Sequence, residues 1–72
     1  MSITYDNLKH WFSYHGPDVE DLLAYEVIRQ KGLELAEAIL VNTEGSADQT
    51  AAIRKVREAV MTANAARACK GK

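Results

Sequence analysis

The chain has 72 residues, a formal net charge of -1, one cysteine and 47% hydrophobic residues. This length excludes more than one domain, and a single thiol excludes an internal disulfide. With no long apolar run and no signal segment, we expect a soluble intracellular protein. Eleven of the hydrophobic residues are alanines, which bury little area but allow close helix packing, so we expect self-association to complete the core.

The charge is unevenly distributed along the chain. Residues 1–45 carry three basic and eight acidic side chains, whereas residues 46–72 carry six and two. Opposite charge on the two parts would favour their pairing in a hairpin or between subunits. A duplex DNA or RNA partner would require a continuous basic patch, which this balance does not favour, but a small anion in one basic pocket is compatible with it.

The first predicted element is a short helix over about residues 3–13. Leu8, Trp11 and Phe12 have the spacing of one helix face, and Gly16-Pro17 ends the element. We expect Trp11 and Phe12 to cover the hydrophobic end of a helical hairpin. Tyr14, with the neighbouring His15, either does the same or projects toward a flat ligand, such as a nucleobase.

A long helix is predicted next, over about residues 18–42. Asp18 and Asp21 lie at its start, where negative charge and capping are favourable, so we interpret them as cap residues rather than as an acid–base pair. Gly32 weakens the middle of this helix by about 1 kcal/mol relative to alanine. We expect it to allow close packing against a second helix.

A second long helix is predicted over about residues 47–68. Ser46 and Gln49 before it have the S-x-x-Q spacing of a capping box. Within it, a narrow apolar seam recurs at helical spacing, formed by Ile53, Val56, Val60 and Ala63. The predicted fold is therefore all-α, a short N-terminal helix followed by an antiparallel hairpin of two long helices, assembled as a homo-oligomer.

The residues that could carry catalysis form no convincing constellation. His10 and His15 are five residues apart, whereas two histidines aligned on a helix face for a metal would be four apart. Cys69 lies near the end of the chain and is expected to be inert. We therefore expect no enzyme activity, no metal and no cofactor.

Basic side chains offer a better basis for ligand binding, because the guanidinium fork suits phosphate. Arg29 lies in the first long helix, and Arg57 shares a face with Met61 in the second. The alternative is that these arginines are solvated or paired with Glu26 or Glu58, and for any one of them taken alone this interpretation is the favoured one.

The stretches YHGPDVEDLLAYEVIRQKGLELAEAILVNT and SADQTAAIRKVREAVMTANAARA resemble the phage helical-hairpin family typified by the type-two anti-CBASS sponge protein. The resemblance covers about residues 12–68, and its most specific run is REAVMTANAA. The chain departs from the family at ARACKGK, where a more apolar continuation is expected. The resemblance implies a non-enzymatic homohexamer that sequesters cyclic oligonucleotide second messengers in the host cytoplasm and so blocks the effectors they activate.

The resemblance also implies where ligands bind. Its cyclic dinucleotide pocket comprises Tyr14, His15, Pro17, Arg29, Met61 and Thr62. In that pocket Tyr14 stacks on a base, Arg29 packs over a base or phosphate, and the third-helix residues come from a neighbouring protomer. Arg54 and Arg57 are the candidates for a separate cyclic trinucleotide pocket. The alternative function is a helical protein–protein interaction module without a nucleotide ligand, and a phosphodiesterase is the weakest hypothesis.

Overall fold

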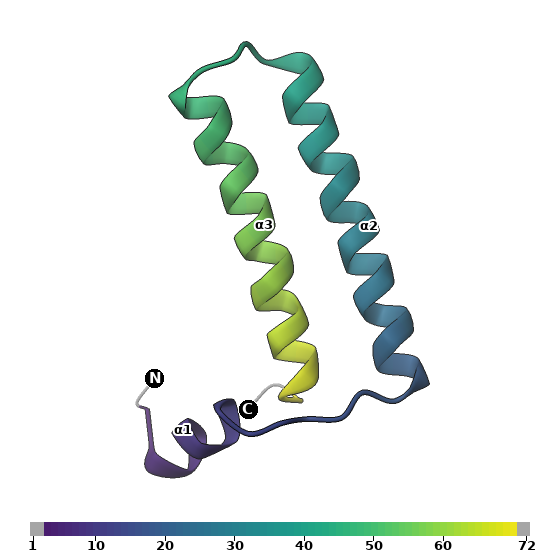
Figure 1. Ribbon diagram of the computed structural model, residues 1–72, viewed down its shortest axis with the longest axis vertical. Coiled ribbons are helices and arrows are strands. Elements are labelled where there is room, and N and C mark those ends of the chain that lie inside the picture. The colour runs from purple at the N-terminus through teal and green to yellow at the C-terminus, as the bar shows by residue number, and fades with distance from the viewer. Residues whose placement is uncertain (1–2, 71–72) are drawn as a thin grey trace.

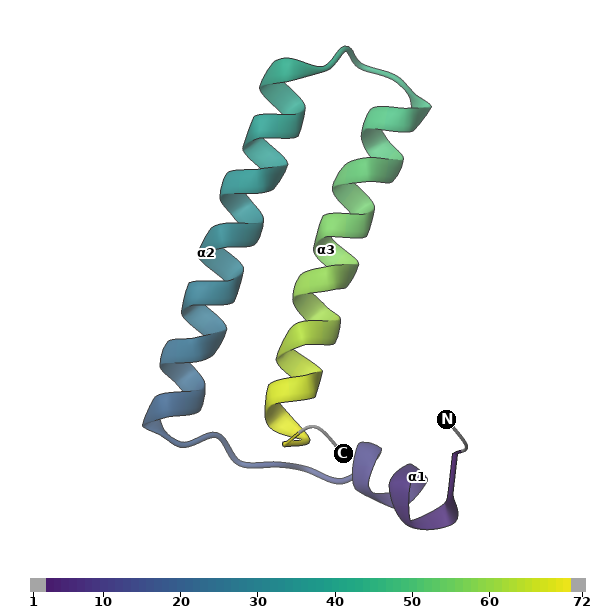
Figure 2. The same cartoon turned by 180° about the vertical axis from the view of Figure 1, so that it is seen from behind.

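The computed structural model describes residues 3–70, which form three helices, α1 (Tyr5–Trp11), α2 (Val19–Asn42) and α3 (Ala47–Ala68). α2 and α3 form an antiparallel hairpin, and α1 lies at its open end beside the C-terminal end of α3 (Figures 1 and 2). Within these residues there is no strand. The predicted all-α architecture is confirmed.

Both long helices begin at caps that the sequence predicts. The Asp21 N–H donates to Asp18 Oδ1 at 2.8 Å, and the Asp18 N–H donates back to Asp21 Oδ2 at 3.3 Å, completing a capping box. At α3 the Gln49 N–H donates to Ser46 Oγ at 3.1 Å. Within the described residues the Gln49 side chain does not return to the Ser46 N–H, so the capping box predicted at S-x-x-Q is only half formed. The Gln49 amide instead donates across the turn to the Thr43 carbonyl and hydroxyl oxygens, both at 3.1 Å, and so ties α3 to the end of α2.

α2 and α3 lie in close contact at a seam formed by Gly32, Val56 and Val60. A Cβ atom at Gly32 would overlap Val60 Cγ2 and would lie 3.9 Å from Val56 Cγ1. Glycine is therefore needed for this helix separation, which confirms the prediction of close packing at Gly32 and offsets its low helix propensity.

The hairpin alone buries little apolar surface. None of the hydrophobic side chains in residues 3–70 is buried, and the molecule is only 17 Å thick along its shortest axis. Phe12 is 84% exposed, so the expectation that it covers the end of the hairpin is wrong for the single chain. The reason is that α1 lies beside the open end rather than beneath it (Figure 1). None of the helices described is long and apolar enough to cross a membrane.

Candidate functional site

A groove on one face of the hairpin follows the contact between α2 and α3. It encloses about 260 Å³ and has an apolar floor with an arginine from each helix. Its lining residues are Arg29, Gly32, Leu33, Ala36, Ile53, Val56, Arg57, Val60 and Met61. The structure thus brings Arg29 and Met61 together within one chain, whereas the resemblance implies that Met61 comes from a neighbouring protomer. Arg57, a candidate for the separate trinucleotide pocket, lines the same groove. We refer to this feature as the arginine groove.

The two arginines of this groove are not neutralised by carboxylates. Within residues 3–70 no acidic side chain lies at ion-pair distance from Arg29 or Arg57, so pairing with Glu26 or Glu58 does not occur. The nearby basic residue Lys31 does pair, with Glu34 at 3.3 Å. The arginine groove therefore combines two uncompensated positive charges with an apolar surface, an arrangement suited to an anion that carries flat rings.

A second groove, of about 460 Å³, lies on the opposite face of the same seam. Helical periodicity separates the two, because Arg29 and Leu33 lie to one side of Gly32 whereas Ile28 and Leu35 lie to the other. This second groove is lined by Ile28, Lys31, Gly32, Leu35, Lys55, Val56, Ala59, Val60 and Ala63. Its walls are largely aliphatic, with one lysine from each helix, Lys31 and Lys55, of which Lys31 pairs with Glu34. It lacks the planar guanidinium groups that suit bidentate contact with phosphate.

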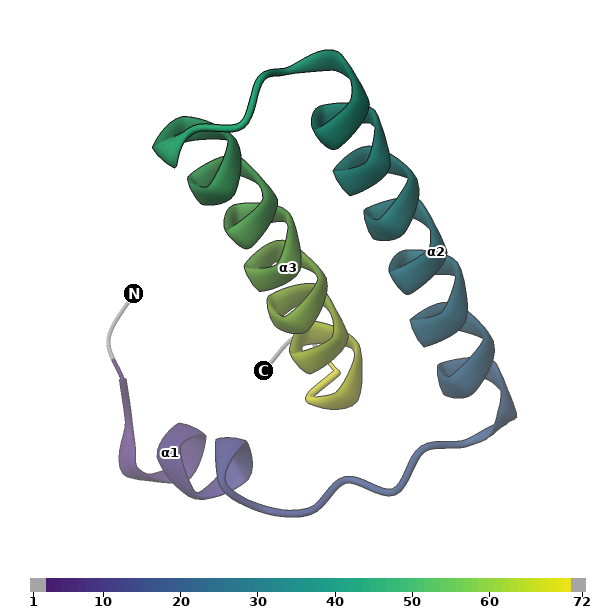
Figure 3. The ribbon, with the colours of Figure 1, turned by 45° about the horizontal axis from the view of Figure 1, so that its top comes forward.

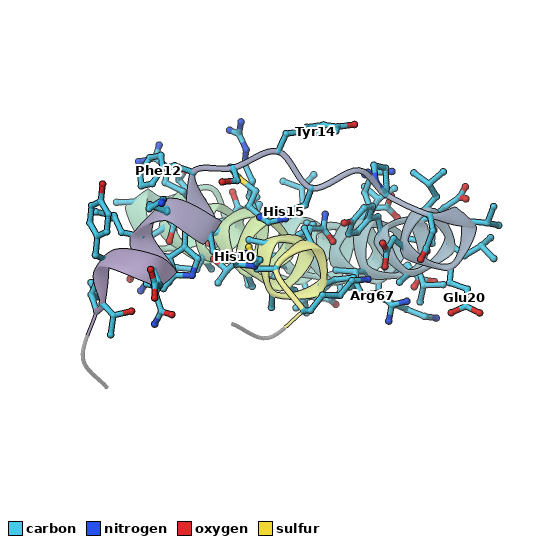
Figure 4. All side chains as sticks on the ribbon, turned by 90° about the horizontal axis from the view of Figure 1, so that it is seen from below. His10, Phe12, Tyr14, His15, Glu20 and Arg67 are labelled. Carbon is cyan, nitrogen blue, oxygen red and sulfur yellow. The ribbon has the colours of Figure 1, made fainter. Side chains whose placement is uncertain are left out.

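The linker between α1 and α2 crosses the open end of the hairpin and carries three predicted site residues, Tyr14, His15 and Pro17 (Figure 3). The Tyr14 side chain is 89% exposed and lies along the outer side of the linker, with its ring near Gly16 (Figure 4). His15 points inward, toward α1 and the end of α3 (Figure 4). Tyr14 and His15 thus lie on opposite sides of this linker, and Tyr14 is the one that a ligand can reach.

His15 and His10 meet at the end of α3, where Cys69 is the C-terminal cap. The two imidazole centroids are 4.2 Å apart. His15 Nε2 donates to the His10 carbonyl oxygen at 2.6 Å, and His10 Nε2 donates to the Cys69 carbonyl oxygen at 3.1 Å. We call His10, His15 and Cys69 the open-end junction. The helix-spacing argument missed it because α1 ends at Trp11, so His15 reaches His10 from the linker rather than along a helix face.

An ion-pair cluster around the buried carboxylate of Asp21 joins the start of α2 to the end of α3. The Asp21 carboxylate accepts from Arg67 Nε at 2.9 Å and from Lys70 Nζ at 3.3 Å. Burial would raise the pKa of Asp21, but hydrogen bonds from the Asp18 N–H, Arg67 and Lys70 outweigh it and hold the pKa below its ordinary value of 3.8. This pairing explains Arg67, the departure from the family pattern, because its charge compensates a buried carboxylate.

The predicted site residues thus fall into separate groups within one chain. Arg29, Arg57 and Met61 line the arginine groove, whereas Tyr14 and His15 lie at the open end. Pro17 is exposed on the linker. Arg54 and Thr62 are exposed on α3 and line neither groove. The open-end junction and the Asp21 cluster each include a contact between residues 46 or more positions apart, His10 with Cys69 and Asp21 with Arg67, which local sequence patterns do not reveal.

Comparison with known proteins assigns the chain to a family. The model of the Acb2/Tad1 hairpin domain matches residues 4–68, so the chain belongs to this family of helical hairpins. The match extends the similar region to include α1. No curated protein sequence and no solved structure matches significantly.

Proposed function

We propose that this protein binds and sequesters cyclic oligonucleotide second messengers without cleaving them. Cyclic dinucleotides such as cyclic GMP-AMP are the proposed main ligands, and cyclic trinucleotides are further candidates. Membership of the Acb2/Tad1 hairpin family supports this proposal. In an infected bacterial cell, such a protein would act in the host cytoplasm and prevent CBASS effectors from being activated.

The observation that carries the proposal is the pair of unpaired arginines over an apolar groove. A cyclic dinucleotide has two phosphates and two flat bases. Arg29 and Arg57, on facing helices, can each donate hydrogen bonds to a phosphate oxygen, and the aliphatic floor can accept a ring. Met61 lies at the edge of the same groove and adds a polarisable contact.

A second copy of the chain would complete the site. Tyr14 lies on the linker at the open end and is not among the residues that line the groove of its own chain. We infer that Tyr14 stacks on a base bound in the groove of a neighbouring protomer, with His15 and Pro17 shaping the wall and Thr62 close by. The exposed apolar side chains favour such assembly, for which a homohexamer is our expectation.

Arg54 and Arg57 remain the proposed contacts for a cyclic trinucleotide. Arg57 would then contact either class of ligand, because it also lines the arginine groove. Arg54 lies outside that groove. Competition between the two classes of nucleotide distinguishes a shared pocket from two separate ones. A shared pocket predicts mutual exclusion, and separate pockets predict simultaneous binding.

Titration calorimetry with cyclic dinucleotides, combined with light scattering of the same sample, tests the proposal. We expect saturable binding by an oligomer that remains the same size with and without ligand. An oligomer that shows no binding across di- and trinucleotides would instead support the interaction-module alternative. A monomer at micromolar concentration would contradict the completion of the site by a second chain.

A further inference from the structure

Three side chains with metal-binding atoms converge at the open-end junction, away from the arginine groove. One ring nitrogen of His10, one of His15 and the Cys69 sulfur all lie within 4.8 Å of one another. All three residues are half-buried, and they come from α1, the linker and the end of α3. Figure 4 shows both histidines beside the end of α3. The fold therefore assembles donors that are distant in the sequence.

The hydrogen bonds of the two histidines determine which nitrogen is free. A carbonyl oxygen can only accept a hydrogen bond. The neutral His10 ring therefore carries its proton on Nε2, which faces the Cys69 carbonyl oxygen, and the neutral His15 ring carries its proton on Nε2, which faces the His10 carbonyl oxygen. This leaves the Nδ1 lone pairs available. Metal-binding histidines commonly show this arrangement, in which one nitrogen donates to a carbonyl oxygen and the other binds the ion.

We propose that His10, His15 and Cys69 bind a zinc ion. Two imidazoles and a thiolate suit zinc, and a water molecule would supply the fourth position of a tetrahedron. Cys69 would release its thiol proton to solvent on binding. The ion would also lie at the C-terminal end of α3, where the helix dipole favours positive charge.

The required adjustment is small. Zinc–nitrogen bonds of about 2.0 Å and zinc–sulfur bonds of about 2.3 Å place two nitrogens and one sulfur of a tetrahedral site roughly 3.3 to 3.5 Å apart. One ring nitrogen of each histidine and the sulfur now lie within 4.8 Å of one another, so the donor atoms have to approach by up to about 1.5 Å. In the part of the chain described, α1 does not pack its backbone against α2 or α3, so it can shift by this amount without disturbing the hairpin seam. The bound ion would fix the linker, including Tyr14, against α3.

The experiment uses tag-free, fully reduced protein with zinc or cobalt as the probe and no nucleotide. We expect one zinc per chain, a cobalt spectrum with a thiolate-to-metal charge-transfer band and tetrahedral d–d bands, and slower modification of Cys69 by a thiol reagent when zinc is present. A cobalt spectrum without the charge-transfer band, or unchanged modification of Cys69, would overturn the proposal.

Substitutions of the proposed ligands test where the zinc ion binds. Cys69→Ser and His15→Ala should each weaken zinc binding roughly tenfold or more, because each removes a ligand. Asp6→Asn, which removes an exposed carboxylate from α1, is the control and should bind as the parent does. Zinc binding that persists in Cys69→Ser would contradict the assignment. If that variant fails to fold, the thiol-protection result on the parent protein still decides. The outcome is independent of the proposed nucleotide binding, because nucleotide is absent.

Discussion

The hairpin seam and the open end of the molecule are held by different kinds of contact. At the seam, Gly32 lies against Val60, and the interaction is apolar and repeats along two regular helices. At the open end, imidazoles, a carboxylate and two basic side chains hold the terminal segments together through hydrogen bonds and ion pairs. The seam thus sets the helix separation, and with it the arginine groove, whereas the open end sets the position of the linker and Tyr14.

The largest expected effect concerns the groove along the seam. Replacing both Arg29 and Arg57 by alanine should weaken cyclic dinucleotide binding about a hundredfold, because each loses charge-assisted hydrogen bonds to phosphate. Calorimetry measures the affinity. Replacing both Lys31 and Lys55 by alanine is the matched control, since these lysines line the opposite groove and the change removes the same two positive charges, and its effect should be within about twofold. Equal losses in both variants would indicate only long-range charge attraction.

Tyr14 tests the contribution of the open end to the same ligand. Tyr14→Ala should weaken binding by about tenfold or more, because a base loses its stacking partner. The size of the oligomer, measured by light scattering, should not change, because this side chain is almost fully exposed. Tyr14→Phe keeps the ring and should retain most of the affinity. Unchanged affinity in the alanine variant would show that Tyr14 does not stack on the ligand.

The Asp21 cluster tests the stability of the open end. Asp21→Asn should lower the Tm by about 5 °C or more at neutral pH, because Arg67 and Lys70 lose their charged partner. The folded-state pKa of Asp21 is lowered, so its contribution is complete above the ordinary value of 3.8 and is lost as the pH falls through the lower folded-state value.

The parent protein should therefore lose stability as the pH is lowered below about 4, and Asp21→Asn should show a weaker dependence over that range. Asp48→Asn, at an exposed position in the first turn of α3, is the control and should keep the pH dependence of the parent. Thermal denaturation at several pH values measures both. Identical pH profiles for the parent and Asp21→Asn would contradict the assigned role of the cluster.

The smallest expected effect concerns the seam itself. Gly32→Ala should lower the Tm by about 3 °C although alanine favours helix by about 1 kcal/mol, because the new Cβ overlaps Val60. The same change in a Val60→Ala background should be less destabilising, since the overlapping methyl group is gone. Thermal denaturation of the parent, the two single variants and the double variant measures the coupling between positions 32 and 60. An equal loss of Tm in both backgrounds would show that overlap with Val60 does not cause the destabilisation by Gly32→Ala.

The sequence predicts the hairpin better than it predicts the open end. The caps at Asp18 and Ser46 and the close packing at Gly32 are local signals, and the structure confirms them. Asp21 was correctly predicted as a cap residue, but its pairing with Arg67, 46 residues away, required the helices to be placed in space. The meeting of His15 with Cys69 was missed for the same reason.

The arginine groove could be predicted from the sequence less well than the hairpin but better than the open end. Helical spacing predicted that Arg57 and Met61 share a face, but only the relative rotation of the two helices shows that Arg29 faces the same groove. The same geometry shows that Arg54 and Thr62 lie outside it. Their proposed roles therefore depend on contacts with other copies of the chain.

The most direct test of sequestration is recovery of the ligand. The protein is incubated with cyclic GMP-AMP, separated from free nucleotide by gel filtration and then heated until it denatures, and the released nucleotide is identified by chromatography and mass spectrometry. Our account predicts near-stoichiometric release of nucleotide with unchanged mass and biological activity. Recovery of a cleaved product, or of no nucleotide from a folded oligomer, would contradict it.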